Sequence, residues 1–120
     1  MMKTTTVHIG SKALHVLVAA NVLQQMCGMM FRSWRTLGAD GMLFTFSREA
    51  RWGVEMPFCE SMDVVFFDAQ CRVVDVQHAT PWSRDPRTWK IYRPREKCRY
   101  VLELPPGCSF RTGDQARLNL

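Results

Sequence analysis

The sequence predicts a small α+β domain of mainly β structure, in which a barrel-like or rolled sheet of antiparallel or mixed strands carries one short helix. Short apolar stretches that alternate with period two recur between turn residues along most of the chain, as is typical of strands. A single stretch, residues 21–30, has a helix start signal followed by an apolar stripe. Hydrophobic residues make up 47% of the 120, which is sufficient for one core without disulfides or a metal.

The strands can be placed from their alternation and from the turns between them. We expect them at residues 13–20, 42–46, 52–56, 62–67, 72–76, 100–104 and 116–120. Asp68–Cys71 provides the turn of one hairpin. Residues 1–11 are predicted to be an N-terminal tail and residues 12–120 a single domain. Short strands at this spacing favour a barrel or rolled sheet whose opening is covered by the helix.

The helix is predicted to begin at Asn21, whose side chain can accept from free N–H groups of the first turn. Gln24 follows at the position that a capping box requires, and Gly28 can take the left-handed conformation that ends a helix. One apolar stripe is expected to pack on the core. Met26 and Met30 belong to this stripe, so core packing is preferred over a copper site formed by Met26, Met29 and Met30. The stripe consists of Val22, Leu23, Met26, Cys27 and Met30.

The net charge of +5 is concentrated in one segment. Between residues 84 and 99 seven Lys and Arg residues accompany two acids, whereas cations and acids balance in the rest of the chain. Aromatic residues interleave with these cations, so the segment is a candidate arm for an anion or a nucleic acid. The candidate residues are Trp82, Arg84, Arg87, Trp89, Lys90, Tyr92, Arg93 and Arg95. An acidic protein or anionic ligand is an alternative partner, nucleic acid is less favoured, and the preferred interpretation is an arm that packs its aromatic rings on the sheet.

The five cysteines are odd in number and show no C-x-x-C spacing, which favours reduced thiols over a disulfide scaffold or a zinc finger. No apolar run reaches the length of a membrane span. We therefore expect a soluble, unprocessed cytoplasmic protein, and we predict no metal and no cofactor. A nucleophile arrangement of Cys59, His78 and Asp75 has no supporting motif, and Cys59 is expected to be a small apolar filler.

Asp63 is the first candidate for a functional side chain, because it shares a strand face with Val65 and Phe67. A carboxylate among apolar neighbours must be paired, hydrogen-bonded or protonated. Its expected partners are Arg32, Arg99 or backbone N–H groups. We prefer a structural polar lock for Asp63 and keep a binding or catalytic role as the alternative.

Glu103 is the second candidate, and a solvated or salt-bridged strand residue is its preferred interpretation. It could instead form a carboxylate pair with Asp63 for acid–base chemistry, or join Asp63 and Asp114 in a metal site. We predict a polar pocket flanked by Arg32, Asp63 and Glu103. The preferred function is a non-enzymatic binding or accessory domain. The alternatives are a small hydrolase-like enzyme that uses the two carboxylates, and nucleic-acid or anion binding through residues 82–99.

Four stretches, in this order, resemble the domain-of-unknown-function family numbered 192: Gly28–Arg32, Asp40–Phe44, Met62–Asp68, and Tyr100–Pro105 with Gly107. The resemblance covers roughly residues 12–118. The chain departs from the family pattern at Ser61 and Met62, where a proline and a leucine are usual, at residues 54–58, and in a shortened segment between Gly107 and Gly113. The resemblance implies a compact, mainly β fold with a short helix, and it implies no activity, substrate or cofactor.

Overall fold

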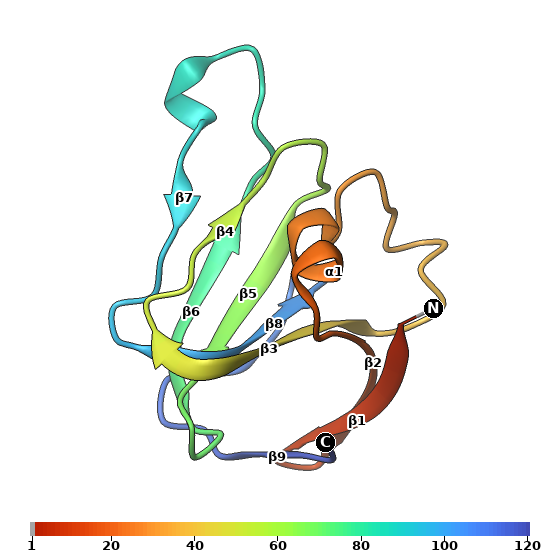
Figure 1. Ribbon diagram of the computed structural model, residues 1–120, viewed down its shortest axis with the longest axis vertical. Helices are drawn as coiled ribbons and strands as arrows, with labels where there is room; N and C mark the ends of the chain where they lie inside the picture. Colours follow the sequence, from red (N-terminus) through yellow and green to blue (C-terminus); the bar gives the residue numbers. More distant parts are fainter. Residues whose placement is uncertain (1) are drawn as a thin grey trace.

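The computed structural model describes residues 2–120 and confirms the predicted class, a mainly β fold with one short α-helix (Figure 1). Seven strands form one curled sheet in the order β6-β5-β8-β3-β2-β1-β9, and β4 and β7 form a separate pair. No helix of the described residues is long and apolar enough to cross a membrane. The strands are β1 (Lys3–Ile9), β2 (Lys12–Ala19), β3 (Gly41–Ala50), β4 (Val54–Glu55), β5 (Met62–Phe67), β6 (Val73–Ala79), β7 (Ile91–Tyr92), β8 (Cys98–Leu104) and β9 (Ala116–Leu118).

The sheet is mixed because one of its pairings is parallel. β2 and β3 run parallel, and the chain between them passes through α1 (Val22–Cys27) and a long loop. All other neighbours in the sheet are antiparallel. A parallel pair needs such a crossover, whereas the antiparallel β1–β2 pair needs only a tight turn, in which Gly10 has a positive φ of 59°.

The sheet curls into a half-barrel, and the residues just before its two outermost strands, β6 and β9, contact each other. Arg72, just before β6, forms an isolated antiparallel bridge with Gln115, just before β9. The Val73 N–H donates to the Asp114 carbonyl at 2.8 Å, and the Ala116 N–H donates to the Cys71 carbonyl at 2.9 Å. We call this contact between residues 71–73 and 113–116 the seam.

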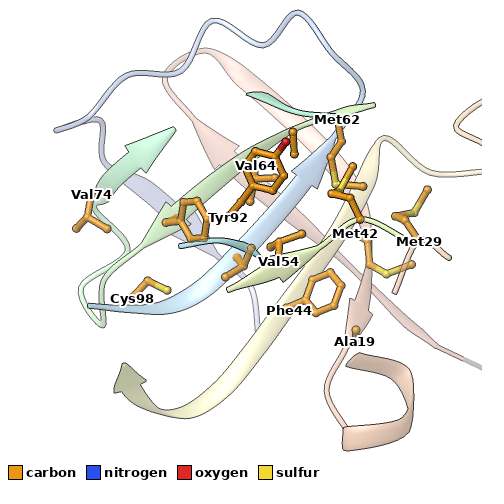
Figure 2. Packing of buried hydrophobic residues seen from close by; sticks show 14 residues of the cluster. Ala19, Met29, Met42, Phe44, Val54, Met62, Val64, Val74, Tyr92 and Cys98 are labelled. Carbon is orange, nitrogen blue, oxygen red and sulfur yellow. The ribbon is translucent and has the colours of Figure 1, made fainter. Parts of the chain in front are cut away.

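The strands β2, β3, β5, β6 and β8 divide their side chains between two cores, one on each face of the sheet. The concave core includes Val16, Leu43 and Val65, and the convex core includes their chain neighbours Met42 and Val64. Figure 2 shows the convex core, where Met29, Val54 and Tyr92 from outside the sheet cover it. Every residue of β5 is buried because both of its faces are covered.

The prediction of an N-terminal tail over residues 1–11 is wrong for the described residues; Met1 lies outside them. Lys3–Ile9 forms β1 and pairs with β2 along its whole length. Val7 and Ile9 are buried in the concave core. The consecutive threonines of this segment are β-branched and suit a strand, although they give it no apolar alternation.

The helix signals are confirmed, but the expected packing of the helix is wrong. Asn21 Oδ1 accepts from the Gln24 N–H at 2.8 Å, and Gly28 ends the helix with a φ of 46°. None of the six residues of α1 is buried. Val22, Leu23 and Met26 are 71–73% exposed, because Met29, which follows the helix, fills the convex core instead. The helix therefore leaves an apolar surface uncovered beside the sheet.

Candidate functional site

A pocket of about 530 Å³ lies on the convex side of the sheet, between α1 and the strands β3, β4 and β8. Its walls are mainly apolar and aromatic, which is usual for a small-molecule site. The lining residues are Val22, Gln25, Met26, Cys27, Gly28, Met29, Met30, Phe44, Phe46, Trp52, Gly53, Val54, Glu55, Pro57, Cys59, Val101 and Glu103.

Glu103 is a buried acid in this pocket and not the solvated or salt-bridged residue that the sequence suggested. It lies on β8, opposite Met42 of β3 and Val64 of β5, and it is only 4% exposed. Its Oε1 atom has no hydrogen-bond partner among residues 2–120. Burial raises the pKa of Glu103 to about 8, since the surrounding low dielectric disfavours the charged form. Burial therefore favours the protonated, neutral form of this carboxyl group.

Cys59 is the thiol in the pocket whose titration is clearly perturbed. Burial, and to a lesser extent the negative charge of a deprotonated Glu103, raise the pKa of Cys59 to about 11. Its Sγ donates to the Pro57 carbonyl at 3.4 Å. Because the thiolate is the reactive form of cysteine, this thiol is poorly suited to be a nucleophile. His78 and Asp75 do not activate it, since His78 binds Asp63 and the Asp75 side chain accepts from Val76, Gln77 and Arg95.

Two strained aromatic residues lie next to the pocket. Phe31 and Phe58 have positive φ angles of 61° and 55°, a conformation that non-glycine residues rarely adopt. Their rings stack with centroids 4.7 Å apart, and the Phe31 N–H donates to the Phe58 carbonyl at 2.9 Å. Both are largely exposed, at 79% and 69%. Their chain neighbours Met30, Pro57 and Cys59 line the pocket, so the pair lies close to it.

Asp63 lies on the other side of the sheet, where it fixes the segment after β8. Its Oδ2 accepts from the backbone N–H groups of Gly107 and Cys108, both at 2.8 Å. Its Oδ1 lies 2.9 Å from His78 Nδ1. Burial raises the pKa of Asp63, but these hydrogen bonds to the ionised form outweigh it and hold the pKa below the usual value. Backbone N–H groups are thus among its partners, as expected, and His78 is an additional one.

The structure does not bring Arg32, Asp63 and Glu103 together. Asp63 is opposite Leu104, which belongs to the concave core, whereas Glu103 lines the convex pocket. Successive residues of a strand point to opposite faces, so this register separates the two carboxylates. Arg32 is exposed, and Arg99 donates through Nε to the Phe46 carbonyl rather than to Asp63.

The trio of Asp63, Glu103 and Asp114 is not formed as a metal site either. Asp114 Oδ2 accepts from the Arg111 N–H at 2.9 Å, within its own turn. Across residues 2–120 no group of three or more His, Cys, Asp or Glu side chains is arranged to hold a metal ion. All five cysteines of this part of the chain are free.

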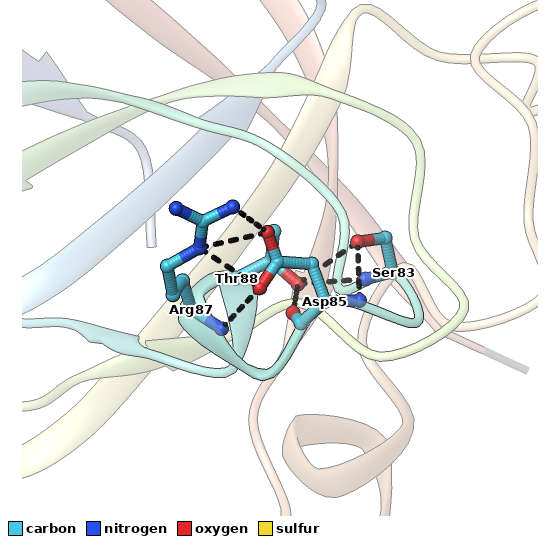
Figure 3. A network of polar contacts seen from close by, with 4 residues as sticks. All are labelled: Ser83, Asp85, Arg87 and Thr88. Atoms are coloured by element: carbon cyan, nitrogen blue, oxygen red, sulfur yellow. Dashed lines mark hydrogen bonds and ion pairs between the residues drawn. The ribbon is translucent and has the colours of Figure 1, made fainter.

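The arm of residues 82–99 holds its own shape through polar contacts. Its part before β7 extends away from the sheet at the top of Figure 1, and the chain then returns through β7 to β8. Trp82 and Trp89 donate their indole N–H groups to the carbonyls of Lys90 and Ser83. Arg87 pairs with Asp85, at the start of the 3-10 turn Pro86–Thr88, and Ser83 and Thr88 complete this network (Figure 3).

The other cations and rings of the arm also contact the protein. Lys90 lies 4.9 Å from the centre of the Tyr92 ring, which is buried in the convex core. Arg93 donates to the Arg51 carbonyl, and Arg95 lies 3.7 Å from an Asp75 oxygen. Arg84 is exposed.

Sequence reasoning identified Glu103 as a candidate but missed the pocket around it. Phe44 of β3, Trp52 of the β3–β4 loop and Val101 of β8 line the pocket, and no local motif connects them. One signal was available, namely that a helix of about two turns has little capacity to bury an apolar stripe. The apolar stripe alone predicts that Met26 packs in the core, but Met26 is exposed and lines the pocket.

Comparisons with known proteins agree with this architecture. A family model for DUF192, described as "Uncharacterized ACR", matches residues 4–116. A UPF0127 protein of Pyrococcus horikoshii is 32% identical over 95 residues, which cover 77% of this chain and 73% of that protein. A UPF0127 protein of Pyrococcus furiosus is 26% identical over 113 residues, 88% of each chain.

Two crystal structures share the fold. The first, described as a "putative transcription regulator" from Sinorhizobium meliloti, has a TM-score of 0.82 at 24% identity and covers 98% of this chain and 95% of its own. The second, a protein of unknown function from Novosphingobium aromaticivorans, has a TM-score of 0.73 at 22% identity over 97% of this chain and 84% of its own. Since the family model spans nearly the whole sequence, the chain belongs to the DUF192 family of uncharacterised proteins.

Proposed function

We propose that this domain is a non-enzymatic binding module that takes a small, mainly apolar organic molecule in the pocket above Glu103. The observation that carries the proposal is the Oε1 atom of Glu103, which is buried in an apolar pocket without a partner. A buried polar group without a hydrogen bond costs about 1–3 kcal/mol, so its retention calls for a compensating role. A ligand with one polar group supplies the missing hydrogen bond.

The exposed apolar residues around the pocket support the same proposal. Val22 and Met26 line it and are 73% and 71% exposed, and the strained pair Phe31–Phe58 lies beside it. Backbone strain of this kind costs of order 1–3 kcal/mol per residue and is concentrated at functional sites. A bound molecule with an apolar body would cover this surface.

A hydrolase-like enzyme is less well supported. The two carboxylates needed for acid–base work lie on opposite faces of the sheet, and the Cys59 thiol has a pKa of about 11. Neither arrangement provides a nucleophile with an adjacent base.

The pocket can be tested by blocking it from an exposed position. Met26→Trp places a large ring in the lining, whereas Leu23→Trp places the same ring on α1 outside the lining, and the parent residues are both 71% exposed. In a fragment screen followed by amide NMR shifts, we expect ligands to perturb Cys59, Val101 and Glu103. Binding should weaken at least tenfold in Met26→Trp and remain in Leu23→Trp. Shifts clustered away from the pocket, or equal binding by both variants, would contradict the proposal.

We also propose that the arm of residues 82–99 serves the fold rather than a nucleic acid. Support comes from the indole hydrogen bonds of Trp82 and Trp89 and from the contacts of Arg87, Arg93 and Arg95 within the protein. DNA is nevertheless the partner to test first, given the description of the Sinorhizobium meliloti protein.

We expect only weak, sequence-independent binding of a labelled oligonucleotide in an anisotropy titration, abolished by about 200 mM salt because it rests on phosphate contacts alone. Arg84→Ala, at an exposed cation, should lower even this binding. Binding that persists at that salt concentration, and that discriminates between sequences, would overturn the structural role.

A further inference from the structure

We propose that the pocket binds a small organic cation, an alkyl- or arylalkylammonium ion, whose head pairs with the Glu103 carboxylate and whose apolar body lies against Phe44, Val54 and Val101. This inference rests on the proposed binding function and names the chemical class of its ligand. The head group would donate hydrogen bonds to the unpartnered Oε1 atom. Hydrogen bonds in which the donor or the acceptor is ionised are about twice as strong as neutral ones.

The charges of the pocket point to a cation. The protein carries a net charge of +5, yet the pocket is lined by two acids, Glu55 and Glu103, and by no Lys, Arg or His. Because the lining contains acids and no basic residue, this pocket disfavours anions although the protein as a whole is basic. An anionic ligand would place its charge beside these acids with no counter-charge in the lining.

Cations close to the pocket are already engaged by other groups. Arg93, whose side chain lies beside the lining residue Gly53, donates to the Arg51 carbonyl. Arg99, on the same strand as Glu103, donates to the Phe46 carbonyl, and Arg48 lies 5.3 Å from the centre of the Trp52 ring. None of these three cations lines the pocket. Trp52 also stacks on Phe46, at 4.4 Å between centroids, so this end of the pocket is a rigid apolar wall. Glu103 thus has no internal counter-ion and is available to an incoming one.

Binding of a cation should be coupled to loss of a proton from Glu103. The other titratable groups that line the pocket are Cys27 from α1, Glu55 from β4 and Cys59 from the loop before β5. Cys59 is neutral because its pKa is about 11, and Glu55 is exposed. The proton released near neutral pH therefore comes from Glu103, whose pKa is about 8. An ammonium ion favours the ionised carboxylate and displaces that proton.

The test uses pairs of a cation and its uncharged counterpart: phenethylamine with 2-phenylethanol, and benzylamine with benzyl alcohol. Affinities are measured by calorimetry at pH 6, 7 and 8, where an alkylamine with a pKa of about 10 stays protonated. The wild type should prefer the amine at pH 8. Its affinity for the amine should rise about 50-fold from pH 6 to pH 8, following the ionised fraction of a group with a pKa of about 8.

Two variants complete the design. Glu103→Gln keeps the size of the side chain but cannot ionise, so the preference for the amine and the pH dependence should both vanish. Glu55→Gln removes the other acid of the lining and should keep the pH dependence. Circular dichroism confirms that both variants are folded before they are compared.

The possible outcomes distinguish failure of the cation proposal from failure of the proposed binding function. Amine and alcohol binding equally at every pH, or amine binding unchanged in Glu103→Gln, would overturn the cation while leaving the pocket proposal intact. Fragment hits in the pocket that are only neutral or anionic would have the same consequence. Failure of every fragment to perturb the pocket would instead remove the proposed function itself.

Discussion

Replacement of Asp63 by alanine is expected to lower the free energy of unfolding by about 3–4 kcal/mol, because a hydrogen bond to a charged group contributes about 1.5–3 kcal/mol and Asp63 makes three. The expected loss is smaller than the sum of three such bonds, because the Gly107 and His78 donors are partly in contact with solvent and can bind water instead. The loss should appear as a lower midpoint in urea with an unchanged slope. The segment after β8 should then show faster amide exchange at Gly107 and Cys108 than in the wild type.

One further variant separates the charge of Asp63 from its shape, and a second serves as a control for the loss of an exposed carboxylate. Asp63→Asn keeps an oxygen acceptor but loses the charge, so it should be intermediate between alanine and the wild type. Asp85→Ala, which removes a carboxylate from the exposed pair with Arg87, should cost clearly less. An Asp63→Ala protein as stable as Asp85→Ala would show that the segment after β8 is held by other contacts.

The depressed pKa of Asp63 also sets an acid limit for the fold. Since its folded-state pKa lies below the unfolded value of about 3.9, its contribution is complete above that pH and is lost as the pH falls through the folded-state pKa. Below about pH 4 the wild type should therefore lose stability, and Asp63→Ala should lose correspondingly less. Parallel acid transitions in the two proteins would contradict this assignment.

The second large effect is a decline in stability as the pH rises, caused by Glu103. Its folded-state pKa of about 8 lies above the unfolded value of about 4.3, so the folded state holds the extra proton between these limits. The stabilisation is complete below about pH 4 and is lost progressively as the pH rises toward 8. We expect the free energy of unfolding of the wild type to fall by about 2–4 kcal/mol between pH 5 and pH 8 through this group. The limiting slope is about 1.4 kcal/mol per pH unit, and local relaxation around the charged form lowers it.

Glu103→Gln cannot titrate, and it should therefore lack this decline and be more stable than the wild type at pH 8. Urea titrations at pH 5, 6, 7, 8 and 9 measure the difference between the two proteins, which removes the contribution of the remaining groups. Glu55→Gln is the matched control, because Glu55 lines the same pocket but is exposed, and it should follow the wild type. A difference between Glu103→Gln and the wild type that stays constant with pH would mean that Glu103 is ionised in the folded protein.

Stability and binding are expected to oppose each other at this residue. A glutamine at position 103 would be the more stable choice at neutral pH, but it would abolish the proposed charge for an incoming cation. Natural proteins commonly retain such a destabilising group where function needs it.

The local signals of the sequence were sufficient for most of the fold. Alternation predicted the strands around Val16, Phe44 and Val101, and Asn21 and Gly28 predicted the two ends of the helix. These features depend on a few neighbouring residues and on backbone preferences that act over the same range.

The arrangement of the candidate site depends on register, which one sequence does not reveal. Alternation shows that Asp63 shares a face with Val65, and that Glu103 shares a face with Val101. It does not show that Asp63 lies opposite Leu104, which places the two acids on opposite faces. A shift by one residue would have placed them together.

Two further features were beyond local reasoning. The threonines at the start of β1 lack an apolar pattern, and they are ordered by pairing with β2. The positive φ angles of Phe31 and Phe58 oppose the preference of bulky residues, and they are maintained by the stacking of the two rings and the hydrogen bond between them.

The seam between residues 71–73 and 113–116 has a consequence for self-association. Outermost strands of an open sheet expose backbone groups on which another copy can add a strand, a common route to fibrils. Here Val73 and Ala116 already exchange those hydrogen bonds with the opposite margin of the same sheet. Along this stretch a second molecule finds no backbone template, so concentrated protein should resist strand-by-strand polymerisation for as long as the two margins stay joined.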